Sequence, residues 1–182
     1  MGATDRPDLL GAALSGPSRR TIPVAYTVRE KNGRDQAWVD ATLRERWGAT
    51  VIVSRGCLYH AQKHPALIAE RDGERCGLAT YRLERSGCEI LTLDTFPRFQ
   101  GAGTALIDAL VVRAKQAGVR RVWLVTSNDN LDALRFYQRR GFSLVAVHRN
   151  AVAQARKLKP SIRAVGNYGI PLVDEVELEH VL

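Results

Sequence analysis

The chain has 182 residues, of which 45% are apolar and 25% are charged. These values are ordinary for a globular protein, and the length allows one domain with a sizeable core that needs no disulfides. The formal net charge of +8 and the pI near 9.9 favour an anionic partner, which leaves open a nucleotide, a phosphorylated cofactor, an acidic substrate or a nucleic acid. No apolar run approaches transmembrane length, so no membrane span is predicted.

Residues 1–20 are rich in Gly, Ala, Ser, Pro and Arg and show little periodicity, which predicts a mobile N-terminal tail. Residues 21–182 are then expected to form a single domain without internal repeats. The three cysteines, Cys57, Cys76 and Cys88, lack the spacing of a metal site, so no metal is predicted. An odd number of cysteines in such a chain indicates reduced thiols and a cytoplasmic protein.

Apolar periodicity and turn residues predict an alternation of strands and helices. A strand at 24–29 precedes a helix that begins after Asp35 as N-cap and ends at Trp47, before Gly48. Further helices are predicted from the turn at 98–104 to about 117, at 131–140 and at 152–158, and strands at 51–53, 67–70, 76–84, 89–95, 121–126, 142–147 and 176–181. The stretch 55–65 is ambiguous, and 159–173 is predicted as a loop. The strand–helix–strand order across 89–126 predicts a parallel pair within one mixed α/β sheet of about seven strands.

The sequence Arg98-Phe99-Gln100-Gly101-Ala102-Gly103-Thr104 joins an apolar strand to an amphipathic helix. Its two glycines leave the main chain uncrowded where the helix begins, and a helix N-terminus presents about four unpaired N–H groups at the positive end of its dipole. Such a turn favours a bound phosphate group, although similar glycine turns also serve as plain connections. It is not a Walker loop, because no Gly-Lys-Ser/Thr follows, and it is not a complete Rossmann fingerprint, because Leu106 replaces the third glycine.

A second motif, Asn130-x-x-Ala133-x-x-Phe136-Tyr137-x-x-x-Gly141-Phe142, follows the turn in the predicted order of elements. Together the two motifs resemble those of the GNAT superfamily of acetyl-CoA-dependent N-acetyltransferases. The resemblance implies a mixed, mostly antiparallel sheet of about seven strands, flanked by helices, with a splayed central parallel pair. It also implies acetyl-CoA as co-substrate and an amine as acceptor.

The resemblance further implies where acetyl-CoA binds. After Arg98, the turn would cradle the pyrophosphate with the amides of five residues: Gln100, Gly101, Ala102, Gly103 and Thr104. In similar enzymes the preceding strand bulges and splays, and the pantetheine arm pairs with the freed main chain, here around Leu91 and Leu93. Asn130 would hydrogen-bond the arm from the far side, and Ala133 and Tyr137 would belong to the same site.

Two side chains are candidates for acid–base catalysis. Tyr137 stands at the family's tyrosine position and would protonate or hydrogen-bond the leaving thiolate, unless it only packs against the cofactor. A main-chain N–H near Leu93 would polarise the thioester carbonyl. Glu89 is the candidate base, with a solvated edge residue or a chain of waters as the alternatives. A two-residue turn at Ser86-Gly87 would place Glu84 opposite Glu89 at an exposed hairpin end, with a modestly raised pKa for one of these carboxyls.

The acceptor is less well defined. In this family its pocket is walled by the first helix, the segment before the central strands and the loop before the last strand, and here these contain Arg55, Tyr59, His60, Arg163, Asn167 and Tyr168. The leading interpretation is a small-molecule or amino-terminal N-acetyltransferase. The alternatives are a protein N-terminal or lysine acetyltransferase and a non-catalytic acyl-CoA-binding module. A nucleic-acid partner is not expected, and a homodimer is left open.

Overall fold

The computed structural model describes residues 25–98 and 100–182, so the predicted tail, Val24 and Phe99 lie outside the described part. The helices and strands follow the predicted order closely. The α-helices are α1 (Gln36–Trp47), α2 (Ala102–Gln116), α3 (Leu131–Gln138) and α4 (Ala151–Leu158). The strands are β1 (Thr27–Glu30), β2 (Val51–Ser54), β3 (Cys57–His60), β4 (Ala66–Arg71), β5 (Glu74–Glu84), β6 (Gly87–Thr95), β7 (Arg121–Ser127), β8 (Ser143–His148) and β9 (Glu175–Val181).

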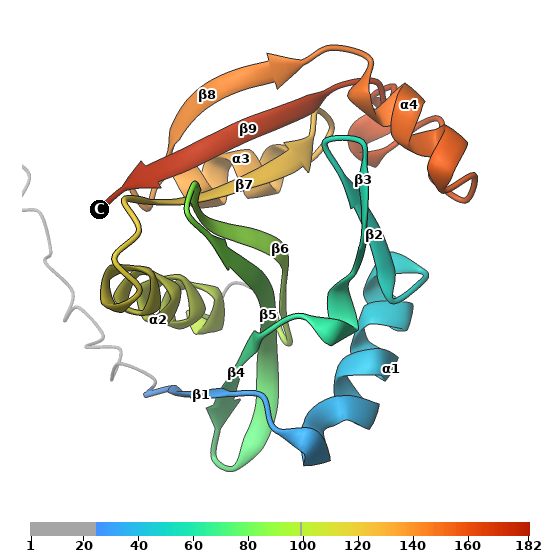
Figure 1. Ribbon diagram of the computed structural model, residues 1–182. Coiled ribbons are helices and arrows are strands. Elements are labelled where there is room, and N and C mark those ends of the chain that lie inside the picture. The colour runs from blue at the N-terminus through green and yellow to red at the C-terminus, as the bar shows by residue number, and fades with distance from the viewer. Residues whose placement is uncertain (1–24, 99) are drawn as a thin grey trace, which may run out of the picture.

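Seven strands form one sheet in the order β1-β4-β5-β6-β7-β9-β8 (Figure 1). Only β6 and β7 are parallel among these neighbours, which confirms the parallel pair predicted from the strand–helix–strand order. Helices α2 and α3 pack on one face through the larger core cluster. Helix α1 covers the other face together with a separate antiparallel hairpin of β2 and β3. The mixed fold expected from the resemblance is therefore confirmed.

The helices begin and end where local signals place them. The side chain of Asn32 caps a short 3-10 turn that leads into α1, and Gly48 ends α1 in a left-handed conformation with φ of 71°. Helix α1 buries Val39 and Leu43 against the sheet. Helix α2 buries Leu106, Ile107, Leu110 and Ala114, the apolar stripe that its sequence predicts.

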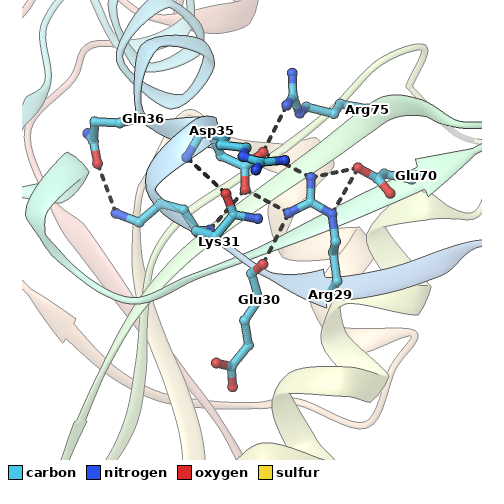
Figure 2. A network of polar contacts seen from close by, with 9 residues as sticks. Arg29, Glu30, Lys31, Asp35, Gln36, Glu70 and Arg75 are labelled. Carbon is cyan, nitrogen blue, oxygen red and sulfur yellow. Dashed lines mark hydrogen bonds and ion pairs between the residues drawn. The ribbon is translucent and has the colours of Figure 1, made fainter.

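An ion-pair network around the buried Asp35 holds the start of α1 against the sheet (Figure 2). Asp35 is only 1% exposed and accepts hydrogen bonds from Arg29 on β1 at 2.7 and 2.9 Å. It also pairs with Arg75 on β5 at 2.9 Å, while Arg29 reaches Glu70 on β4 at 2.7 Å. The Arg29 guanidinium holds the pKa of the Asp35 carboxyl well below its usual range. Asp35 thus ties β1 and β5 to the start of α1, and Arg29 extends the link to β4 through Glu70.

The hairpin between β5 and β6 has a register different from the predicted one. Its two turn residues are Arg85 and Ser86, and Glu84 pairs with Gly87, which places Arg82 rather than Glu84 opposite Glu89. Gly87 lies in β6 and pairs with Glu84. Glycine is needed there because its φ is 138° and a Cβ would lie 2.9 Å from the main-chain oxygen of Arg121 on β7. Glu89 is 2% exposed, so the expectation of an exposed hairpin end is also wrong.

The ambiguous stretch 55–65 contains the turn of the β2–β3 hairpin, β3 itself and a 3-10 turn at Ala61–Lys63. The predicted loop at 159–173 includes a short 3-10 turn at Asn167–Gly169. Cys57, Cys76 and Cys88 are free thiols. Within the described part of the chain, no helix has the length and apolar character needed to cross a membrane.

Candidate active site

The central parallel pair of strands opens partway along its length. Strands β6 and β7 pair only from Cys88 with Val122 to Ile90 with Leu124. On the opposite side of β6 the register to β5 shifts, so that Leu91 has no partner between the paired residues Ile90 and Thr92. The main chain of β6 beyond Ile90 therefore has no β7 partner among the described residues. The bulge and the splay that the resemblance implies are both present.

A first cavity of about 320 Å³ lies between the glycine turn, α3 and the splayed end of β6. It brings together eight of the predicted cofactor-binding residues: Leu93, Arg98, Gly101, Gly103, Thr104, Asn130, Ala133 and Tyr137. Leu91 lines a second cavity instead. Gln100 and Ala102 line neither cavity. The Gln100 side chain accepts a hydrogen bond from Arg71 at 2.8 Å, and the Ala102 side chain is buried.

The first cavity carries an excess of positive charge. Two acids, Asp94 and Asp132, face five cations among its lining residues: Arg46, Arg98, Arg135, Arg139 and Arg140. Arg140 lies over the Phe136 ring at 3.6 Å and donates to the Thr104 hydroxyl at 3.0 Å, which places its charge beside the glycine turn. Guanidinium groups pair well with phosphate oxygens, so this charge suits a phosphate-bearing ligand.

The two glycines of the turn serve different purposes. Gly101 is the N-cap residue of α2 and has φ of 105°. The Ala105 amide donates the first hydrogen bond of the helix to the Gly101 carbonyl at 3.1 Å. The amides from 102 to 104 are therefore left without a helical partner, as a phosphate cradle requires. At Gly103 a Cβ would lie 3.0 Å from the Phe136 ring, so this glycine lets α2 and α3 approach each other.

Tyr137 lies deep in the core and yet lines the first cavity. It is 5% exposed and meets Phe136 and Phe142 edge-on, with ring centroids 5.0 and 5.2 Å apart. Burial, helped by the nearby Asp94, raises the pKa of the Tyr137 hydroxyl above its usual value. The hydroxyl therefore keeps its proton through the neutral range. Burial also raises the pKa of Asp94, which accepts a hydrogen bond from the Trp47 indole at 2.8 Å.

Asn130 acts as the cap of α3. Its side-chain oxygen accepts from the Ala133 amide at 3.3 Å, and its side-chain nitrogen donates to the Thr126 hydroxyl at 3.1 Å. Asn130 and Arg46 line both cavities, so these two residues mark the place where the cavities adjoin.

The second cavity, of about 540 Å³, lies between the β2–β3 hairpin, α4 and the ends of β6, β7 and β9. Its walls are mostly apolar, and the charged lining residues are Arg46, Lys159, Arg163 and Glu175. Of the six side chains predicted near the acceptor, only Arg163 lines this cavity. Glu175 was missed by the sequence reasoning, although the alternation of glutamates with Val176 and Leu178 along β9 indicates one polar face.

The tip of the β2–β3 hairpin is held by two buried glutamates. The Ser54 hydroxyl donates to Glu89 Oε1 at 3.0 Å, and the Arg55 amide donates to Glu175 Oε2 at 3.0 Å. Figure 1 shows the hairpin reaching from α1 toward α4. Glu89 Oε2 accepts from Arg82 Nε at 2.6 Å, so both oxygens of Glu89 are bonded, and Glu89 lines neither cavity.

Comparison with known proteins agrees with this geometry. Residues 29–142 match the Acetyltransferase (GNAT) family. The chain belongs to the GNAT acetyltransferase family. A relative, the uncharacterized protein YdhI of Bacillus subtilis, is 36% identical over 139 residues, which cover 76% of this GNAT chain and 87% of the relative.

Solved structures share the fold of this GNAT chain. The IAA acetyltransferase from Bacillus cereus matches it with a TM-score of 0.66 at 20% identity, over 87% of this chain and 100% of that one. A GNAT family acetyltransferase from Elizabethkingia anophelis, solved with acetyl-CoA bound, matches with a TM-score of 0.61 at 17% identity, over 86% of this chain and 98% of that one.

Family membership makes the protein an acyltransferase that uses acetyl-CoA as its co-substrate. The first cavity fits such a molecule on three counts visible in its residues. The turn at Gly101 presents amides without helical partners, five arginines surround the space, and the main chain of β6 is free of a strand partner on one side.

Proposed function

We propose that this GNAT enzyme transfers an acetyl group from acetyl-CoA to a primary amine. The observation that carries the proposal is the opening between β6 and β7, where two cavities of different character share Arg46 and Asn130. The arginine-rich cavity suits the phosphates of the donor, and the mostly apolar cavity offers separate room for an acceptor. An acyl-CoA-binding module without catalysis would need only the first of these cavities.

The roles assigned to individual residues are part of the proposal. Arg98 and the turn amides hold the pyrophosphate, and the main chain around Leu91 and Leu93 pairs with the pantetheine arm, with an N–H near Leu93 polarising the carbonyl. Tyr137 gives a proton to the thiolate, which its buried, protonated hydroxyl supports. The base role of Glu89 stays a prediction, and its bonds to Arg82 and Ser54 favour a structural role for it.

The test is release of the free thiol of coenzyme A, measured over a panel of small amines and peptides beside calorimetric binding of coenzyme A. We expect binding and turnover on at least one class of primary amine. Binding without turnover on any acceptor would support the non-catalytic acyl-CoA-binding module. Turnover on peptides alone would support the protein acetyltransferase.

A further inference from the structure

The second cavity combines a mostly apolar lining with three cations and one buried acid. Its walls include Ile52 from the hairpin, Leu91 and Val125 at the splay, Val152 on α4, and Ile162 and Leu172 from the segment before β9. Glu175 is the one carboxylate among the lining residues, and it is 5% exposed. A buried carboxylate in such surroundings is costly without a positively charged partner, so its presence here calls for a physical reason.

One oxygen of Glu175 is committed to the protein, and the other is not. Oε2 accepts the Arg55 amide at 3.0 Å, whereas Oε1 has no hydrogen-bond donor among the described residues. The other glutamates on this face of β9 are paired: Glu177 with His148 and Arg121, and Glu179 with Arg121. Glu175 is thus an acceptor group bonded to the hairpin turn through one oxygen, with the other oxygen left for a ligand in the cavity.

The cations of the second cavity do not occupy that oxygen. Lys159 donates to the carbonyl oxygens of Trp47 and Val51, both at 3.0 Å, and Arg46 lies over the Phe96 ring at 4.3 Å. Arg163 is exposed at the rim. An ammonium group that enters with an apolar body would meet apolar side chains of the hairpin, the splay and α4, and one unshared carboxylate oxygen.

We propose that the acceptor is a primary amine carried on an apolar body, and that Glu175 binds its ammonium group and removes the proton. This proposal rests on the proposed function and names the acceptor class and the base for it. The ammonium gives one proton to Oε1, and from there the proton passes to solvent. The nitrogen lone pair then forms the C–N bond to the acetyl carbon as the C–S bond breaks. The thiolate takes a proton from the Tyr137 hydroxyl. Tyr137 regains a proton when the nitrogen loses its second one, so the products are one amide, one thiol and one proton.

The surroundings of Glu175 support this basic character. Burial raises the pKa of the Glu175 carboxyl, and Glu89 on β6 adds to the rise. The Arg55 amide and side chain in the hairpin turn, and His148 on β8, act in the opposite direction and are outweighed by burial. A carboxylate with a raised pKa is a stronger base at neutral pH.

The first experiment compares wild-type enzyme on alkylamines and measures kcat/KM by thiol release. We expect kcat/KM to rise at least about tenfold from propylamine to hexylamine, and ethanolamine to be poor. A preference for polar amines would overturn the acceptor class. If no amine is acetylated, the proposed function fails. Calorimetry of hexylamine with the coenzyme A complex then still decides whether the cavity binds an amine through Glu175.

The second experiment uses Glu175→Gln, with Glu179→Gln as a matched control on the same face of β9. Gln keeps an oxygen for the Arg55 amide, so we expect unchanged coenzyme A affinity. We expect kcat/KM on hexylamine to fall about 100-fold at pH 7, with a loss that shrinks as the pH approaches the amine pKa of about 10.4. Hexylamine should also bind more weakly. A loss that is constant across pH, or equal to that of the control, would overturn the base role.

If Glu175→Gln folds poorly, Glu175→Asp keeps the charge and draws it back by one methylene. We then expect a pH profile of wild-type shape with reduced kcat. Glu89→Gln tests the rival base in the same assay. A pH-dependent loss confined to Glu89→Gln would transfer the role to Glu89 and overturn the proposal.

Discussion

Tyr137 combines burial with access to the first cavity, and this is the basis for the proposal that its protonated hydroxyl is the proton donor. We expect Tyr137→Phe to lower kcat by about 100-fold while the affinity for coenzyme A changes little, because the ring and its edge-on contacts remain. Steady-state kinetics and calorimetry measure the two quantities. Tyr81→Phe is the control, since Tyr81 is also buried and lines neither cavity. Equal losses of kcat and affinity would show that Tyr137 only packs.

Gly103 gives a second prediction at the level of single residues. A Cβ at this position would lie 3.0 Å from the Phe136 ring, so Gly103→Ala should force α3 away from α2 and destabilise the protein by about 1–3 kcal/mol. Gly33→Ala is the matched control, because nothing lies within 4 Å of a Cβ there. Thermal unfolding measures both variants. Combining Gly103→Ala with Phe136→Leu should recover part of the loss, and a loss that the smaller side chain does not relieve would contradict the packing explanation.

At the level of elements, the stability of the α1 end of the sheet depends on Asp35. Its depressed pKa means that its stabilising contribution is complete above the unfolded value of about 3.9 and is lost as the pH falls through the folded value. Asp35→Asn should cost about 1.5–3 kcal/mol at neutral pH because two half-buried arginines lose their charged partner. Urea unfolding at a series of pH values measures this.

The same titration distinguishes a specific network from a general effect of charge. Wild-type stability should fall more steeply than that of Asp35→Asn as the pH drops below about 5, so the two curves converge in acid. Asp72→Asn changes the same charge at an exposed turn and should leave both the stability and its pH dependence nearly unchanged. Parallel curves for wild type and Asp35→Asn would contradict the role given to this carboxylate.

The elements were predictable where the signal is local. The apolar stripe of α2 and the glycine at the end of α1 depend on neighbours within a few residues, and both predictions are confirmed. The register of the β5–β6 hairpin was missed because Gly87 is required by its contact with β7, which the turn sequence does not reveal. Strand β3 is mostly exposed, and without buried alternate positions its sequence carries no strand pattern.

The candidate site was likewise predictable only where its residues lie close together in the sequence. Most residues of the first cavity lie in or near the two motifs, so a resemblance located eight of them together, whereas Arg46 comes from α1 and was not predicted. The second cavity is built by segments far apart in the chain, and the bond from Arg55 to Glu175 spans 120 residues. The sequence places Glu175 at the start of β9 but does not reveal its contact with the β2–β3 hairpin, so its role could not be predicted.

The whole molecule has two adjoining cavities, which we propose hold the donor and the acceptor, and this bears on the order of chemical events. A direct transfer needs both molecules bound at once, whereas a relay through the enzyme needs a nucleophile beside the thioester. None of the three cysteines lines either cavity. Burial raises the pKa of Cys88 to about 12, so its reactive thiolate form is negligible at neutral pH, and Cys57 is exposed on the hairpin.

We therefore expect a ternary complex. Initial rates measured against acetyl-CoA at several amine concentrations should give intersecting double-reciprocal lines, because each substrate binds without displacing the other. Incubation with acetyl-CoA alone should leave the intact mass of the protein unchanged, and Cys57→Ser should keep the wild-type pattern. Parallel lines together with an acetylated protein would show that the acetyl group first moves to a side chain, which would remove the reason for two cavities to share Arg46 and Asn130.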